Sequence, residues 1–222
     1  MTNGPPAIPD HPSAPDHTAP NHHAHHRGFA GPAGFLAAAS MTLAGRRRAR
    51  LASRLTELAA GDIVADVGCG PGTAARRAAR RGAEVFAVDP APVMLRLGRL
   101  ITWGAPVHYV AGQAETLPLP GSSATVVWSI AAVHHWADLD AGLREARRVL
   151  RPGGRLLVIE RLAAPGATGL ASHGWTAGQA AEFAGRCRAH GFAATQVDQH
   201  PGGRQPMISV RATAPEAGQT PG

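Results

Sequence analysis

The sequence contains no lysine, since all 22 of its basic side chains are arginines. Codon usage in a GC-rich genome produces the same bias, so it is not by itself evidence of nucleic-acid binding. Only two cysteines occur, Cys69 and Cys187, and two thiols so far apart do not build a disulfide framework, which fits a reducing compartment. The chain has neither a basic-then-apolar leader nor an uninterrupted apolar run of about 18 residues. We therefore expect a soluble, cytoplasmic protein without stable membrane insertion.

What is present is a chain of 222 residues with a formal charge of +7. This length suffices for one α/β domain and is too short for two ordinary ones. Residues 1–27 are rich in proline and histidine and lack a periodic apolar face, which predicts a disordered tail. Its histidines have no cysteine or acidic partners at the spacing of a closed site, so we expect no metal centre there. These histidines are His11, His17, His22, His23, His25 and His26.

Residues 28–60 are expected to form a helical N-terminal appendage. Leu51, Leu55 and Leu58 recur at helical spacing and predict a buried face, with the arginines of the segment 46–50 pointing outward. That arginine cluster is either a solvated helix face or a surface that attracts an anionic substrate, a nucleic acid or a membrane.

The most informative stretch runs from Val64 to Gly72. Small and β-branched residues predict a buried parallel strand, and three glycines at alternate positions (Gly68, Gly70, Gly72) predict a tight turn before a helix over 73–81. Glycines let the backbone approach a ligand closely, and the N–H groups that begin a helix favour an anionic or electron-rich one. The pattern predicts a nucleotide-type cofactor, although Thr73 stands where a dinucleotide-binding motif needs its third glycine.

Three more strands are expected, over 83–89, 107–110 and 124–130. Asp89 ends the first of them, where a nucleotide-binding fold places a carboxylate for both ribose hydroxyls; the alternative, compatible role is to cap the helix that begins near Pro92. The last strand leads into His134-His135-Trp136. Both histidines are candidate general bases because imidazole titrates near neutral pH, or one of them orients the loop through the backbone. Trp136 either walls the pocket or anchors the next helix.

In the rest of the domain, predicted helices and strands continue to alternate. The sequence predicts a helix from residue 138 that ends at the Pro-Gly-Gly turn of 151–154, a strand over 155–160 and a helix over 175–190. A closing hairpin over 192–199 and 207–212 completes a domain at 61–213, and residues 214–222 are expected to be frayed.

Three motifs in order resemble class I S-adenosylmethionine-dependent methyltransferases, especially the small-molecule group that includes ubiquinone and menaquinone C-methyltransferases. They are the G-x-G-x-G turn with Asp66 two residues before it, the run G-Q-A-E-T-L-P over 112–118, and L-R-P-G-G-R-L-L-V-I-E over 150–160. The resemblance spans about residues 50–165. It implies an α/β, Rossmann-like, seven-stranded and mostly parallel sheet with helices on both faces and an antiparallel last strand.

The resemblance also implies the cofactor, S-adenosyl-L-methionine, and its binding residues. Asp66 would face the amino-acid end of the cofactor, and Gln113 and the backbone after it would face the adenine. Gln113 and Thr125 stand where the family usually carries Asp, and residues 28–44 match a region that often forms a lid. The implied cofactor-binding set is Asp66, Gly68, Cys69, Gly70, Gly72, Asp89, Pro90, Gln113, Ala114, Glu115 and Ser129.

The expected function is methyl transfer to a small-molecule acceptor, whose accepting atom (oxygen, nitrogen or carbon) stays open, as does the oligomeric state. An NAD(P)-dependent oxidoreductase would share the turn, but Thr73 and the run over 112–118 argue against it. A nucleic-acid methyltransferase would usually carry N-P-P-Y or D-P-P-Y after the fourth strand, where this chain has His134-His135. The third alternative is a cofactor-binding protein without catalysis.

Overall fold

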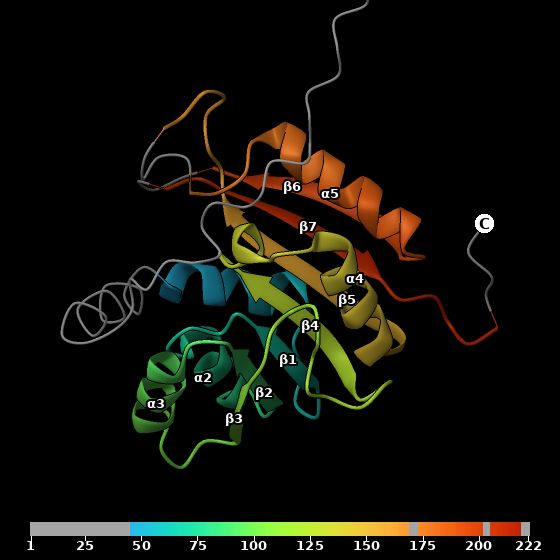
Figure 1. Cartoon of the computed structure of the whole chain (residues 1–222). Coiled ribbons are helices and arrows are strands. Elements are labelled where there is room, and N and C mark those ends of the chain that lie inside the picture. Colours follow the sequence, from blue (N-terminus) through green and yellow to red (C-terminus); the bar gives the residue numbers. More distant parts are fainter. Residues whose placement is uncertain (1–44, 169–172, 202–204, 219–222) are drawn as a thin grey trace, which may run out of the picture.

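The computed structural model describes residues 45–168, 173–201 and 205–218, which are built around one seven-stranded sheet (Figure 1). The strand order is β3-β2-β1-β4-β5-β7-β6. β7 pairs antiparallel with β5 and with β6, and the other neighbouring strands pair in parallel. The expected fold class is therefore confirmed. The strands are β1 (Ile63–Val67), β2 (Glu84–Asp89), β3 (Val107–Ala111), β4 (Ala124–Ile130), β5 (Leu150–Arg161), β6 (Ala193–His200) and β7 (Met207–Thr213).

Alternate residues of the central strands face two helix layers, as the two-residue repeat of a strand requires. Val64 and Trp128 belong to a core shared with the helix over 45–55, α2 (Thr73–Ala79) and α3 (Pro92–Ile101). Ala65 and Val127, one position away, belong to the opposite core with α4 (Leu139–Val149) and α5 (Ala177–Ala189). Helices thus cover both faces of the sheet.

The helix over 45–55 is an integral part of this core. Leu51 and Leu58 are each 4% exposed, as their spacing predicted, and Leu55 is partly buried. The predicted disordered tail over 1–27 and the predicted lid over 28–44 lie outside the described residues. Among the described residues, no helix is both long enough and apolar enough to span a bilayer.

Three boundaries differ from the expectation. α2 ends at Ala79, two residues before the predicted end. β5 begins at Leu150, which pairs with Ala124 before an irregularity, so the segment 151–154 belongs to a bulged strand and does not end the helix; Gly153 takes a φ of 71° there. The prediction that the chain is frayed from residue 214 is wrong for its first residue. Ala214 is 1% exposed, and its N–H donates to the carbonyl of Gly154 at 2.8 Å.

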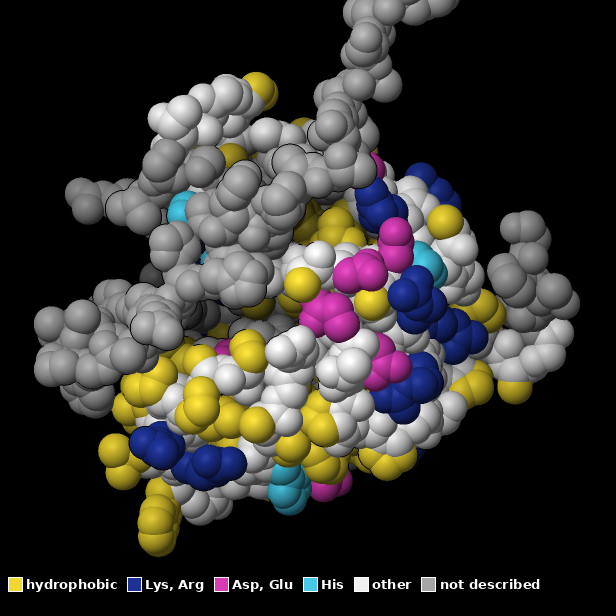
Figure 2. Space-filling view, viewed as in Figure 1, with side chains coloured by type: hydrophobic (Ala, Val, Ile, Leu, Met, Phe, Trp, Pro, Cys, Tyr) yellow, Lys and Arg dark blue, Asp and Glu magenta, His cyan; other side chains and the backbone are white. Residues whose placement is uncertain are grey.

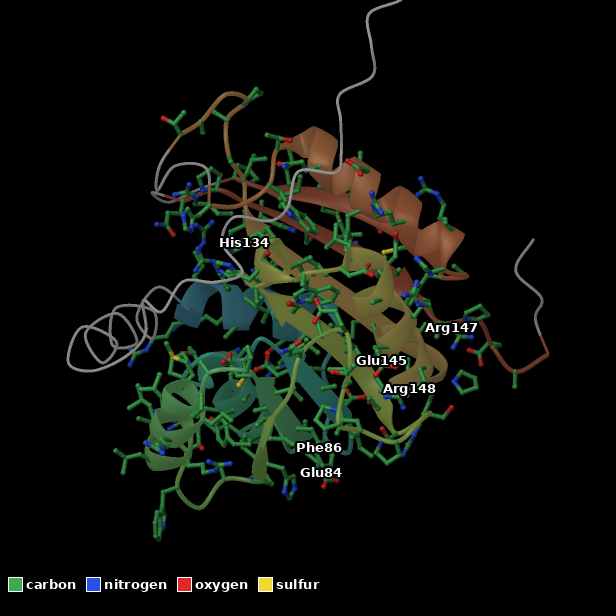
Figure 3. All side chains as sticks on the ribbon, viewed as in Figure 1. Glu84, Phe86, His134, Glu145, Arg147 and Arg148 are labelled. Atoms are coloured by element: carbon green, nitrogen blue, oxygen red, sulfur yellow. The ribbon has the colours of Figure 1, made fainter. Side chains whose placement is uncertain are left out.

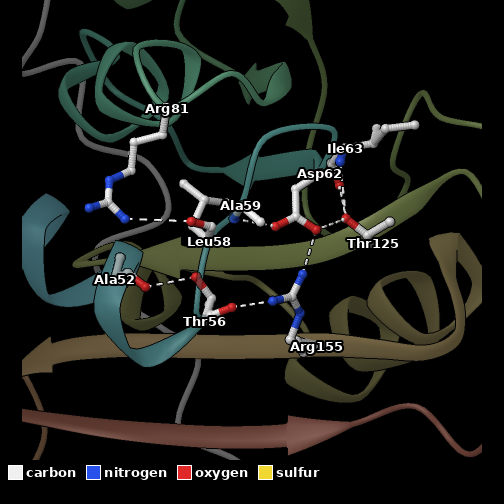
Figure 4. A network of polar contacts seen from close by, with 9 residues as sticks. All are labelled: Ala52, Thr56, Leu58, Ala59, Asp62, Ile63, Arg81, Thr125 and Arg155. Carbon is white, nitrogen blue, oxygen red and sulfur yellow. Dashed lines mark hydrogen bonds and ion pairs between the residues drawn. The ribbon is translucent and has the colours of Figure 1, made fainter.

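A polar network joins the N-terminal helix to the amino ends of β1, β4 and β5 (Figure 4). Asp62 accepts from the Ala59 N–H at 2.9 Å and from the Thr125 hydroxyl at 2.7 Å, and it pairs with the Arg155 guanidinium. Arg155 also donates to the carbonyl of Thr56. Thr125, one of the two departures from the family pattern, therefore serves the end of the sheet opposite to the glycine turn.

Candidate functional site

The candidate site lies where the strand order reverses, between β1 and β4. Going outward from β1, β2 and β3 follow on one side and β4 and β5 on the other. In open parallel sheets ligands bind outside the carboxyl ends of the strands at such a point. The glycine turn after β1, Asp89 at the end of β2 and the segment after β4 all meet there.

The glycine turn needs its glycines for conformation and for space. Gly68, Gly70 and Gly72 have φ values of 73°, 52° and 77°, in the left-handed region that favours glycine. A Cβ at Gly68 would overlap the side chain of Ala132, and one at Gly72 would overlap the hydroxyl of Tyr109. Gly72 is also the N-cap of α2 and provides no side-chain cap. The turn therefore presents backbone instead of side chains at the carboxyl edge of the sheet.

Asp66, near the end of β1, is a buried carboxyl with an unsatisfied oxygen. The residue is 1% exposed, and its Oδ2 has no hydrogen-bond partner. Burial raises its pKa to about 7; the indole of Trp128 opposes the rise, and the charge of Asp89 adds to it. A buried acceptor without a partner is costly in a folded protein, so this oxygen is suited to a donor that arrives with a ligand.

Asp89 uses both carboxylate oxygens to hold the turn together. Oδ2 accepts from the Gly70 N–H at 2.8 Å and Oδ1 from the Ala91 N–H at 2.9 Å. The N-cap of α3 is Ala91, without a side-chain cap, so the alternative role of Asp89 as the cap of this helix is wrong. Burial raises the pKa of Asp89, and the two backbone donors oppose this rise. Each oxygen keeps a further lone pair, so the carboxylate can still accept from hydroxyl groups.

The other residues implied by the resemblance divide by exposure. Gln113 and Pro90 are exposed, whereas Ala114 and Cys69 are buried. The Cys69 thiol donates to the carbonyl of Gly70, and burial raises the pKa of that thiol. Cys69 therefore belongs to the framework of the turn through its side chain and exposes only backbone at the edge.

Two side chains of the implied set contact other parts of the protein. Glu115 Oε1 accepts from the N–H groups of Ala137 and Asp138, at 2.7 and 3.2 Å, and so fixes the start of α4. The Ser129 hydroxyl donates to the carbonyl of Val67 at 2.9 Å and joins β4 to β1 beside the turn. Both side chains are engaged in positioning the site.

His134 lies just beyond the end of β4, on a short 3₁₀ helix (Val133–His135), and it is paired with a buried carboxylate. Its Nδ1 lies 3.0 Å from Oε2 of Glu160, which is fully buried and accepts from the Val133 N–H through its other oxygen. Figure 3 shows His134 at the arrowhead end of β4, far from Arg148 on α4. A carboxylate on one ring nitrogen fixes the orientation of the imidazole and directs the other nitrogen away from it.

Two more imidazoles adjoin His134. The ring centroids of His134 and His135 are 4.0 Å apart, and His173 lies 5.9 Å from His134. Among the described residues, no group of histidine, cysteine and acidic side chains could hold a metal ion. Trp136 is 7% exposed and its indole lies against Gly142, so it anchors α4. No role was predicted from the sequence for Glu160 or His173. An acid near the end of a predicted strand, as Asp66 and Asp89 also are, was a usable indication for Glu160, whereas His173 had none.

Comparisons with known proteins point to one kind of domain. Residues 65–158 match a family model described as a methyltransferase domain. A malonyl-[acyl-carrier protein] O-methyltransferase of Pseudescherichia vulneris is 43% identical over 91 residues, which cover 41% of this chain and 36% of that protein. A demethylmenaquinone methyltransferase of Tropheryma whipplei is 35% identical over 118 residues, covering 50% and 46%. The match thus spans less than half the length of either relative.

A comparison with solved structures finds a similar fold. A solved S-adenosylmethionine-dependent methyltransferase of Aquifex aeolicus superposes with a TM-score of 0.63 at 17% identity, covering 75% of this chain and 89% of that one. At this identity the likeness concerns the fold alone.

Proposed function

We infer that this chain, which belongs to the class I S-adenosylmethionine-dependent methyltransferases, transfers a methyl group from S-adenosyl-L-methionine to a small-molecule acceptor. The observation that carries this inference is the pair of buried carboxyls, Asp66 and Asp89, on either side of a turn in which Gly68 and Gly72 have no room for a Cβ. The two relatives named above are described by different acceptors, so the proposal commits to a small molecule and not to one compound.

The residues of the turn fit this cofactor. Asp66 Oδ2 is a buried acceptor without a partner, suited to the ammonium group at the amino-acid end of the cofactor. Asp89 has lone pairs left for the two ribose hydroxyls. The exposed Gln113 and the backbone of Ala114 would face the adenine, while Glu115 and Ser129 would act indirectly, by holding the surrounding loops.

The cofactor supplies an activated methyl group on a sulfonium, so the protein mainly has to hold an acceptor in line with it and exclude water. His134 is the residue we propose for any proton that the acceptor loses. Glu160 contacts the imidazole at Nδ1, so a proton taken up by the ring would go to Nε2, and the carboxylate would stabilise the imidazolium that forms. His135 lies at ring-contact distance and is exposed, so it is the second candidate.

The test is calorimetric titration of the full chain with S-adenosylmethionine and S-adenosylhomocysteine, followed by a screen of small acceptors with a labelled methyl donor. We expect one cofactor bound per chain, competition between the two compounds, and label transfer that depends on protein concentration. NAD(P)H serves as the negative control, because an oxidoreductase of similar fold would bind it. Absence of binding of either adenosyl compound would refute the proposal.

A further inference from the structure

Two joined grooves beside α2 are lined mainly by arginine. The larger has a volume of about 430 Å³ and is lined by side chains of the helix over 45–55 and of α2 and its end. Its six arginines are Arg46, Arg50, Arg76, Arg77, Arg80 and Arg81. The smaller groove, of about 300 Å³, shares Arg76 and Arg80 with it and continues along the turn that follows α3, over 102–106.

The positive charge in these grooves is not balanced. Among the described residues, no acidic side chain lines either groove and none of the six arginines forms an ion pair. Burial lowers the pKa of Arg77, and the charges of Arg81 and Arg50 lower it further. The face with α4 and α5 differs, since basic and acidic side chains lie side by side there (Figure 2), as in the pairs of Arg148 with Glu145 and Arg186 with Asp140.

Helix stability does not account for the arrangement. Arg46 and Arg50, like Arg76 and Arg80, are four residues apart, and like charges at this spacing destabilise a helix. The helix dipole favours cations at the end of α2, which explains Arg76 and Arg77 in its last turn and Arg80 at its C-cap. It does not explain Arg46 and Arg50 on the other helix. A bound anion between the two helices would relieve the repulsion.

A large aromatic side chain stands at the open end of the smaller groove. Trp103 lines this groove and is 90% exposed, which makes it the most exposed of the large apolar side chains among the described residues. Exposed aromatic rings stack on nucleobases, while guanidinium groups form paired hydrogen bonds to phosphate. The chain places both kinds of group along one continuous surface.

We propose that these joined grooves bind a ligand carrying a nucleotide with at least two phosphate groups, with the phosphates on the arginines and the base on Trp103. The larger groove has a volume within the range of small-molecule sites, so the proposal commits to a nucleotide and not to a protein or membrane surface. The ligand is either a free nucleotide, whose two phosphates are joined to each other, or a single strand, whose phosphates lie between successive nucleotides. Thr73, next to the glycine turn, lines the larger groove, but no residue proposed for the cofactor lines either groove, so the proposal does not depend on methyl transfer.

The test is calorimetric titration of the full chain and its variants with ADP, with pyrophosphate and with a short oligouridylate, together with the tryptophan fluorescence of the wild type. S-adenosylhomocysteine is kept saturating so that the adenosine does not occupy the glycine-turn site. Trp128, Trp136 and Trp175 are buried, so quenching by the ligand reports on Trp103. The variants are R76A/R80A and W103A, and the matched control is R144A/R147A, which removes the same charge from α4.

We expect ADP to quench the fluorescence and R76A/R80A to weaken its binding at least about tenfold, since charge-assisted hydrogen bonds to phosphate are lost. W103A should bind ADP more weakly but pyrophosphate unchanged, and R144A/R147A should behave as wild type. Tighter binding of ADP assigns a free nucleotide, and tighter binding of oligouridylate assigns a single strand. Absence of binding, competition with S-adenosylhomocysteine, or equal loss in R144A/R147A would each overturn the proposal.

Discussion

The cofactor affinity should depend on the protonation of Asp66. Its carboxyl is 1% exposed with a pKa raised to about 7, mainly by burial, so in the free protein it is largely protonated below neutral pH. An ammonium partner favours the ionised form, and binding therefore requires loss of that proton. Only the fraction of protein in which Asp66 is ionised would bind the cofactor, and a pKa of about 7 sets this fraction. The apparent Kd should therefore rise about 25-fold, or about 2 kcal/mol, from about pH 7.5 to about pH 5.5.

Isothermal titration calorimetry with S-adenosylmethionine measures this directly. The range stays below about pH 7.7, where α-amino groups such as that of the cofactor begin to lose their proton. Titrations near pH 7 in two buffers of different ionisation enthalpy should show release of about half a proton. The control is Asp66→Asn, which removes the titrating group at nearly constant size; its Kd should be weaker at high pH and nearly independent of pH. A wild-type Kd that stays constant over this range, or an unchanged pH profile in the variant, contradicts the reasoning.

The same shift has a consequence for stability without ligand. The folded-state pKa of Asp66 lies above its ordinary value of 3.8, so the folded protein binds this proton more tightly than the unfolded chain does. The stabilisation is complete below about pH 4 and is lost as the pH rises to about 7, to a limit of about 4 kcal/mol. Asp66→Asn should therefore unfold at a higher temperature than wild type near pH 8 and at a similar temperature near pH 4, as measured by thermal denaturation. Equal melting temperatures of the two proteins at both pH values would show that ionisation of the buried Asp66 carboxyl does not destabilise the fold.

Three other substitutions separate the parts of the molecule. Asp89→Ala removes the acceptor proposed for the ribose, and should raise the cofactor Kd at least about tenfold by calorimetry; an unchanged Kd would remove Asp89 from the site. Once an acceptor is known, Glu160→Gln should lower kcat about 10- to 100-fold and shift the pH–rate profile, with the cofactor Kd unchanged. The control Glu145→Gln on α4 should leave kcat near that of the wild type. Equal rates in both variants would refute the role of His134 as a base. Arg155→Ala breaks the partly buried ion pair with Asp62 and should lower the free energy of unfolding by roughly 2–3 kcal/mol in denaturant titration. The cofactor Kd should not change, because this network lies at the opposite end of the strands from the glycine turn. A large change in Kd would contradict this expectation.

The order of strands and helices was predictable from local patterns. β1 and β2 are short, largely apolar and flanked by glycine or proline, and Leu143, Ala146 and Val149 repeat at helical spacing on the buried face of α4. Such patterns depend on neighbours in sequence, because burial has a period of two in strands and of nearly four in helices. They also identified the glycine turn, whose positive φ values only glycine adopts readily.

Contacts between distant segments were not predictable in this way. For Asp89 the sequence predicted ribose binding, with capping of α3 as the alternative, but it did not predict that one carboxylate oxygen accepts from the N–H of Gly70, which lies 19 residues away. Glu115 was assigned to the cofactor by analogy, but its carboxylate fixes the start of α4. In both cases the local pattern predicted which residue lies at the carboxyl edge of the sheet. The group that its carboxylate contacts depends on which loops the strand order brings together.

The sequence by itself determined the fold class, the glycine turn and the two acids beside it, because each is encoded by residues close together in the chain. Only the tertiary structure decided that Asp66 is buried with an unsatisfied oxygen, that Glu160 holds His134, and that six arginines from two helices share one groove. Burial and charge are sums over all neighbours in space, and most of those neighbours come from elsewhere in the chain.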